Sequence, residues 1–205
     1  MNRLFTYLHG KSRGKKHRLF MRTMRPTAAT SILNVGAAGT HFGLPDQFEA
    51  TYPYPSRITG GGPSFPDVQD YQRSFPGVNA VVFDGCELPF ADKSFDIVYS
   101  NAVLEHLPAW DLVERFAAEV QRVGKGWFIT TPNFWYPIEP HYHLPFAQFL
   151  PEETQQRLVR SLGKTPYVHL RLLTRRELRR LFPRGRVMGS RVTLYPETLI
   201  AYQAP

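Results

Sequence analysis

Residues 32–45 read "ILNVGAAGTHFGLP". The apolar run Ile32–Val35 leads directly into a loop of small residues, a pattern typical of a buried strand followed by a tight turn. A glycine at the end of a strand lets the backbone approach a ligand closely, because it has no side chain in the way. The segment therefore predicts a ligand-binding loop, with a simple tight turn as the alternative.

Strands and helices alternate along the chain after this loop. Apolar runs predict strands at 79–85, Asp96–Tyr99 and 126–133, and the first of these, unbroken and bounded by turn residues, is expected to be buried on both faces. Helices are predicted at Asp67–Phe75 and at Asp111–Val123, where apolar residues recur at helical spacing. This alternation predicts an α/β, Rossmann-like, doubly wound domain with a mainly parallel sheet.

The C-terminal third departs from this alternation. Residues 134–165 are rich in aromatic residues and proline and fit neither period, so we expect an ordered insertion over one end of the sheet. Thr174 and Glu177 form a Ser/Thr-x-x-Glu capping box that predicts a late helix. Two further apolar runs predict a C-terminal antiparallel strand pair, so that residues 30–205 form a single domain.

The positive charge is concentrated at the N-terminus. The chain has a net charge of +8, eight of its 25 Lys and Arg residues lie within residues 1–25, and its first acidic residue is Asp46. Residues 1–29 are therefore expected to form a basic arm or helix that meets an anionic partner. The alternative is a helix that covers the sheet, with Leu19, Phe20 and Met24 at helical spacing packed inward.

Composition narrows the class of protein. A chain of 205 residues with 42% hydrophobic residues can form one full core. Cys86 is the single cysteine, which excludes a disulfide framework and favours a reducing compartment. We find no apolar run long enough for a transmembrane segment and no secretory signal, and therefore expect a soluble, cytoplasmic protein.

Several segments, in order, resemble the class I S-adenosylmethionine-dependent methyltransferases, especially the methyltransferase domain 11 and ubiquinone/menaquinone methyltransferase type. The resemblance covers roughly residues 30–205, and its most specific part is "LPFADKSFDIVYSNAVLEHL", residues 88–107. "ILNVGAAGT" matches the first-strand glycine motif, "GWFITTPN" the fifth strand and "HLRLLTRRELRRLF" the late helix. The resemblance implies a methyltransferase with S-adenosyl-L-methionine as its cofactor.

The resemblance also implies which residues hold the cofactor. The first loop would pass under the methionine moiety, Asp84 would accept a hydrogen bond from the adenine amine, and Ser100 and Asn101 would line the methionine side. The full expected set is Asn34, Gly36, Ala37, Ala38, Gly39, Gly62, Asp84, Gly85, Cys86, Ser100 and Asn101.

The chain departs from the family pattern at two acidic positions. Asn34 stands where the first strand usually carries an acid, and Gly62, within "ITGGGPS", stands where the second strand usually ends in the acid that binds the ribose hydroxyls. Loss of such a charge-assisted contact costs roughly 1.5–3 kcal/mol. Ser64 and Asp67 are candidate substitutes, and we expect cofactor binding to be weak.

Methyl transfer requires alignment of the acceptor and sometimes a base that removes its proton. The candidate catalytic residues are His141 and His143, in the insertion, and His106, after the fourth strand. Two histidines one residue apart can bind metal, but no His-Glu-x-x-His motif or cysteine accompanies them, so no metal site is expected.

Three functions remain open. The leading hypothesis is a methyltransferase (EC 2.1.1.-) that modifies an oxygen of a small-molecule, glycan or lipid-linked acceptor. The second is a catalytically weak or inactive methyltransferase-like partner or scaffold protein, which the missing ribose acid supports. The third is an RNA methyltransferase whose basic arm binds phosphates.

Overall fold

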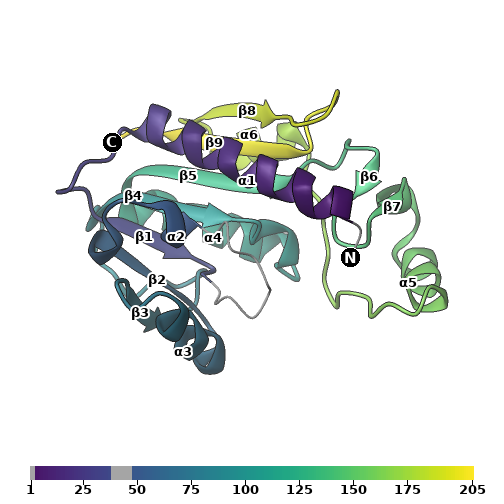
Figure 1. Ribbon diagram of the computed structural model, residues 1–205, viewed down its shortest axis with the longest axis horizontal. Coiled ribbons are helices and arrows are strands. Elements are labelled where there is room, and N and C mark those ends of the chain that lie inside the picture. Colours follow the sequence, from purple (N-terminus) through teal and green to yellow (C-terminus); the bar gives the residue numbers. More distant parts are fainter. Residues whose placement is uncertain (1–2, 38–47) are drawn as a thin grey trace.

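The computed structural model describes residues 3–37 and 48–205. Its centre is a seven-stranded sheet of order β3-β2-β1-β4-β5-β9-β8 (Figure 1). The strands are β1 (Ile32–Val35), β2 (Ile58–Gly62), β3 (Asn79–Val82), β4 (Phe95–Asn101), β5 (Gly124–Pro132), β8 (Arg186–Ser190) and β9 (Thr198–Gln203). The first five are parallel to one another, whereas β9 pairs antiparallel with both β5 and β8. The Rossmann-like α/β fold and its antiparallel C-terminal strands are thus confirmed.

Helices cover both faces of the sheet. On one face lie α1 (Arg3–Met24), α2 (Phe48–Thr51) and α3 (Phe65–Ser74), and on the other lie α4 (Trp110–Val123) and α6 (Arg175–Leu181). The apolar side of α4, which includes Phe116 and Val120, is buried as its spacing predicts. The capping box of α6 is present, since Thr174 Oγ1 accepts from the Glu177 amide and Glu177 accepts from the Thr174 amide.

The basic N-terminal helix packs against the sheet. Figure 1 shows α1 (purple) lying along the face formed by β5, β9 and β8. Phe20 is fully buried and makes edge contacts with the rings of Tyr99 and Phe128, and Leu19 and Met24 are also buried. The apolar side of the helix therefore belongs to the core, and its charges lie on the remaining sides.

The segment after β5 forms a small lobe beside the sheet. It contains a two-stranded antiparallel pair, β6 (Ile138–Glu139) and β7 (Leu144–Pro145), and the helix α5 (Glu152–Ser161). Short 3-10 turns lie at Pro55–Arg57, Leu104–His106 and Ala147–Phe149. Within the described ranges, none of the helices combines the length and apolar character of a membrane span.

One expectation about burial is wrong. The apolar run 79–85 was expected to form a strand buried on both faces, but β3 is the edge strand of the sheet and Val82 is 43% exposed. An apolar run predicts a strand that packs against apolar side chains. It does not predict whether the strand has a partner strand on both sides. Here only β2 pairs with β3.

Asp96 connects the starting ends of three strands and should make stability depend on acidity. Its carboxylate accepts from the Ser31 amide (2.9 Å), from Ser31 Oγ (3.0 Å) and from Lys125 Nζ (2.8 Å). The Lys125 ammonium and the Ser31 amide lower the pKa of Asp96 to about 2. A carboxyl group whose pKa is lower in the folded than in the unfolded state stabilises the protein at pH values above its unfolded-state pKa. This stabilisation is lost as the pH falls through the folded-state pKa.

We therefore expect Asp96→Asn to lower the free energy of unfolding by about 1 kcal/mol at pH 7, a figure reduced for solvent screening of this partly exposed group. The difference between wild type and variant should shrink below pH 4 and vanish near pH 2. Urea unfolding followed across this pH range measures it. A difference that stays constant with pH would show that the carboxylate charge has no part in it.

Candidate functional site

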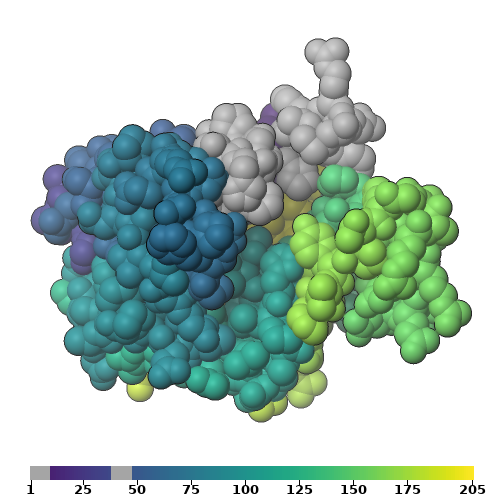
Figure 2. Space-filling view, turned by 90° about the horizontal axis from the view of Figure 1, so that it is seen from below, coloured from purple at the N-terminus to yellow at the C-terminus, as the bar shows by residue number. Residues whose placement is uncertain are grey.

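The strand order of the sheet reverses between β1 and β4. From β1 the chain adds β2 and β3 on one side, and then returns to add β4 and β5 on the other side, so that β1 and β4 are neighbours. At such a point the loops after the two strands diverge and leave a crevice at the carboxyl ends. A cavity of about 970 Å³ lies here, bordered by β1, β4, α1, α2 and residues 167–169. Figure 2 shows the surface hollowed between the teal residues of the sheet and the green residues of the α5 lobe.

A buried carboxylate from α2, that of Glu49, lines the cavity and bonds Asn34 of the first strand. Asn34 Nδ2 donates to Glu49 Oε1, and the Tyr71 hydroxyl donates to the same oxygen at 2.9 Å. Glu49, on α2, is 7% exposed, and burial raises the pKa of its carboxyl. The acid missing from position 34 is thus supplied by Glu49, which is held under the first strand by the amide of Asn34.

Gly36 has backbone angles that favour glycine, and the packing of the neighbouring loop also requires a glycine at this position. Its φ is +83°, and a Cβ at this position would lie 2.2 Å from Val103 Cγ2. The amides of Gly36 and Ala37 both donate to the Gly61 carbonyl, at 2.8 and 3.0 Å. A side chain at position 36 would therefore collide with Val103 in the adjacent loop. Gly36 and Ala37 line the cavity, and the expected Ala38 and Gly39 lie outside the described residues.

The three consecutive glycines of β2 meet three different environments. A Cβ on Gly60 would lie 2.4 Å from the Tyr71 hydroxyl, and one on Gly61 would lie 1.8 Å from the Val81 carbonyl oxygen. For a Cβ on Gly62, no atom of residues 3–37 or 48–205 lies within 4 Å. The first two glycines are therefore required by packing, whereas Gly62 borders open space where the family carries an acid.

The residues after β3 that were expected around the cofactor do not line the cavity. Asp84 is exposed, and its Oδ1 accepts from the Cys86 amide at 2.8 Å. A Cβ on Gly85 would lie 2.8 Å from the Phe116 ring, so this glycine allows close packing. The Cys86 thiol is buried and donates to the Leu112 carbonyl, and burial together with Asp84 raises its pKa.

At the end of β4, Asn101 lines the cavity and holds a lysine from the N-terminal helix. Asn101 Oδ1 accepts from Lys16 Nζ at 2.7 Å and from Thr130 Oγ1 at 2.8 Å. Burial and the nearby Arg13 lower the pKa of Lys16 to about 8. Ser100, expected to line the same side, is fully buried and lies outside the cavity, because successive residues of a strand point to opposite faces.

Two of the three candidate catalytic histidines lie together. His106 and His141 both line the cavity, with ring centroids 5.0 Å apart and rings nearly perpendicular. His141 Nδ1 lies 2.7 Å from Glu139 Oε1, and Glu139 is fully buried. Burial raises the pKa of the adjacent, fully buried Glu105 to about 7 and lowers the pKa of His106. His143 does not line the cavity; it lies in the turn between β6 and β7 with a φ of +57°.

Three residues of this site were not singled out from the sequence. Lys16 was counted only as part of a basic arm, Glu49 carried no motif, and Glu105 was passed over beside His106. The pair Glu105-His106 directly after the fourth strand is the one signal that could have pointed to the site, since polar residues at a strand end meet ligands in this fold.

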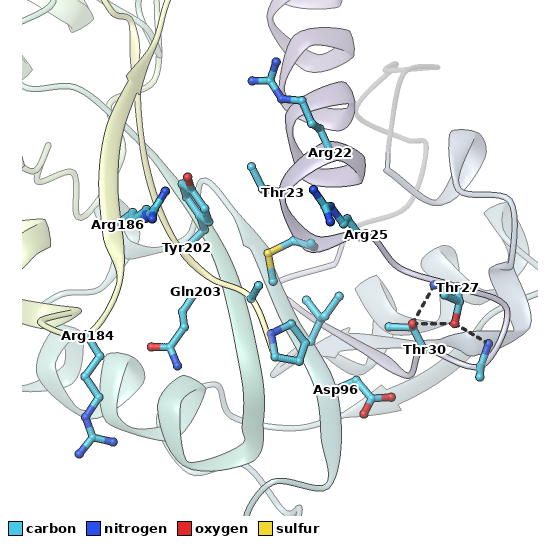
Figure 3. A pocket seen from close by; sticks show the side chains of 15 residues that line it. Arg22, Thr23, Arg25, Thr27, Thr30, Asp96, Arg184, Arg186, Tyr202 and Gln203 are labelled. Carbon is cyan, nitrogen blue, oxygen red and sulfur yellow. Dashed lines mark hydrogen bonds between the residues drawn. The ribbon is translucent and has the colours of Figure 1, made fainter.

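A second cavity, of about 850 Å³, lies at the other end of the sheet, where β1 and β4 begin. Arg22, Arg25, Arg184 and Arg186 border it, and Figure 3 shows that Arg184 points away from Arg22. The arginine side chains do not converge on one point, as recognition of a single anion would require. We therefore assign no ligand to this cavity.

Comparison with known proteins finds a family match over less than half of the chain. Residues 40–129 match the family model described as "Methyltransferase domain". The uncharacterized protein Rv1509 of Mycobacterium tuberculosis is 33% identical over 70 residues, which make up 34% of this chain and 23% of the relative. The matched stretch thus spans less than a quarter of that relative's length.

Solved structures share the fold across most of the chain. The YcgJ protein of Bacillus subtilis superimposes with a TM-score of 0.57 at 20% identity, covering 87% of this chain and 71% of that one. A SAM-dependent methyltransferase of Thermotoga maritima superimposes with a TM-score of 0.59 at 13% identity, covering 97% and 91%. At such low identity the similarity establishes the fold alone.

Proposed function

The chain has the class I S-adenosylmethionine-dependent methyltransferase fold and carries a methyltransferase domain, and from this premise we propose that it methylates an oxygen of a small-molecule, glycan or lipid-linked acceptor. The observation that carries the proposal is the cavity at the switch point, which Asn34, Gly36, Ala37 and Asn101 of the expected cofactor set line together with the candidate bases His106 and His141. Its volume of about 970 Å³ is within the range of ligand sites.

S-adenosylmethionine is the cofactor that the fold implies, and it supplies a methyl group on a cationic sulfonium. Asn34, Gly36, Ala37 and Asn101 would hold its methionine and ribose portions, since all four line the cavity. Asp84 would accept from the adenine amine, because its carboxylate is exposed just after β3. Gly62 itself offers the ribose hydroxyls no carboxylate, which supports weak binding.

The acceptor would enter from the side of the histidines. His141 is held through Nδ1 by the buried Glu139, which leaves its other nitrogen to take or share a proton. His106 lies beside it on the cavity wall, and Tyr167 packs against both rings. A hydroxyl group is the acceptor that most needs such a base, and this is why we favour oxygen.

The basic helix indicates the charge of the acceptor. Arg13, Lys16 and Arg18 of α1 line the cavity. Buried and partly buried cations favour an anionic ligand, so we propose that the acceptor carries a carboxylate or phosphate group and is the partner of this helix. The free thiol of Cys86 is consistent with action in the cytoplasm.

Isothermal titration with S-adenosylhomocysteine tests the cofactor assignment. Wild type should bind one equivalent, and Asp84→Ala should bind about tenfold more weakly because a hydrogen bond to a charged acceptor contributes about 1.5 kcal/mol or more. Asp92→Ala is the matched control. Asp92 is an exposed acid that lies just before β4 begins, at the end of the sheet away from the cavity. Absence of binding by wild type would favour the scaffold alternative.

The RNA methyltransferase alternative predicts that the chain binds RNA. Binding to single-stranded RNA through α1 would weaken steeply with salt. We expect no such salt-dependent RNA binding, because Leu19, Phe20 and Met24 hold the helix against the sheet and the half-buried Lys16 lines the cavity, where it bonds Asn101.

A further inference from the structure

Three metal-ligating side chains from two parts of the chain lie close together, and two of them, His106 and His141, line the cavity. Glu105 and His106 lie in the 3-10 turn after β4, and His141 lies between β6 and β7. One ligand atom from each lies within 4.8 Å of the others. We propose that Glu105, His106 and His141 bind one divalent transition-metal ion, of which Zn²⁺ is the representative case.

Glu105 presents an oxygen that the protein leaves unsatisfied. The side chain is fully buried, and its Oε2 accepts from Thr131 Oγ1 at 3.0 Å. Its Oε1 has no hydrogen-bond partner in the part of the chain that the structure describes. A buried carboxylate oxygen without a partner is costly and uncommon, and a bound cation would satisfy it.

The neighbouring lysine does not fill this role. Lys16 attracts Glu105 electrostatically, but its ammonium is hydrogen-bonded to Asn101 Oδ1 at 2.7 Å. Oε1 of Glu105 therefore stays available for another cation. Since the Lys16 ammonium opposes a second positive charge, its removal should strengthen metal binding.

Each histidine is held through one ring nitrogen, which leaves the other for a ligand. His141 Nδ1 lies 2.7 Å from Glu139 Oε1, while Oε2 of Glu139 accepts from the amides of His141 and Tyr142. The His106 ring is hydrogen-bonded to the main chain of His169. Metal-binding histidines almost always donate their second N–H to a carboxylate or a main-chain carbonyl, and this contact fixes the ring orientation.

The donor set selects the class of metal. Two imidazole nitrogens and one carboxylate oxygen suit Zn²⁺, Co²⁺ or Fe²⁺ better than Mg²⁺ or Ca²⁺, which prefer oxygen ligands. Bonds of about 2.1 Å around a tetrahedral ion separate its ligand atoms by about 3.4 Å. The three side chains would therefore close on the ion by roughly 1 Å, and three protein ligands leave at least one coordination position open.

The open position would face the cavity, since His106 and His141 line it. A hydroxyl bound there would lose its proton more readily, because a metal ion lowers the pKa of a bound oxygen, so that with the ion bound the metal would activate the acceptor in place of the free nitrogen of His141. This consequence rests on the proposed function, whereas metal binding itself does not. The inference departs from the expectation, drawn from the sequence, that the chain has no metal site.

The test is titration of the untagged, chelator-treated full chain with Co²⁺ and Zn²⁺, in the absence of S-adenosylmethionine. We expect one equivalent to bind, with visible Co²⁺ absorption bands of a nitrogen- and oxygen-ligated ion that Zn²⁺ displaces. Glu105→Gln and His141→Asn should each weaken binding by at least about tenfold, and Glu139→Gln, which frees the His141 ring, by about ten- to a hundredfold.

His143→Asn is the matched control, because His143 lies in the same turn outside the cluster and asparagine tolerates its positive φ. Its metal affinity should equal that of wild type. Circular dichroism and thermal unfolding of each variant identify any that fail to fold, and His106→Asn then replaces it. The proposal is wrong if wild type binds neither ion, or if folded Glu105→Gln and His141→Asn both bind Co²⁺ like wild type. Either result leaves the titration with S-adenosylhomocysteine unaffected.

Discussion

Gly62→Asp is expected to bind S-adenosylhomocysteine about ten- to a hundredfold more tightly than wild type. The new carboxylate would stand at the end of β2, where the family places the acid that binds both ribose hydroxyls. A charge-assisted contact of this kind contributes about 1.5–3 kcal/mol. The described part of the chain leaves room for it, since a Cβ on Gly62 meets none of its atoms within 4 Å and the backbone there is not in the left-handed region. Isothermal titration measures the gain.

Two further variants separate charge from size. Gly62→Asn has the same shape without the charge and should gain much less than the aspartate. Gly61→Asp should fail to fold, because its Cβ would lie 1.8 Å from the Val81 carbonyl oxygen. The free Gly62→Asp protein is expected to melt somewhat below wild type, since a carboxylate enters a buried position, and to recover with ligand. Equal affinities for the aspartate and asparagine variants would contradict a ribose contact.

The sequence predicts the strands and helices of this fold well because their signals are local. The apolar run Ile32–Val35 is β1 to the residue, and the apolar spacing between Asp111 and Val123 locates α4. The edge position of β3 could not be predicted, since nothing in residues 79–85 records how many strands pair with them. Pairing is a property of the whole sheet.

The candidate site was predicted only where it lies at strand ends. Gly36 and Asn101 follow β1 and β4, and both line the cavity. Glu49 and Lys16 reach it from helices on either side of β1 in sequence, and no periodicity marks either residue. Long-range side-chain contacts of this kind follow from the packing of α1 and α2 on the sheet, which single-sequence patterns do not encode.

Lys16→Met is expected to tighten the binding of S-adenosylmethionine by roughly tenfold to a hundredfold and to change the affinity for S-adenosylhomocysteine much less. S-adenosylmethionine carries a positive sulfonium, whereas S-adenosylhomocysteine carries a neutral thioether. The Lys16 ammonium bonds Asn101, which we assign to the methionine end of the cofactor. Two like charges several ångströms apart near a protein surface repel by a few kcal/mol at an effective dielectric constant of about 20.

The comparison of the two ligands isolates the charge. Both should be titrated at pH 7, below the Lys16 pKa of about 8, so that the wild-type ammonium is charged. Lys15→Met is the matched control, since Lys15 is exposed on the same helix and donates to the Arg191 carbonyl outside the cavity. An equal gain for both ligands would mean that the shorter side chain merely opens the cavity. If the affinity for neither ligand increases, the sulfonium does not lie near Lys16. The ammonium would then contact only the anionic acceptor.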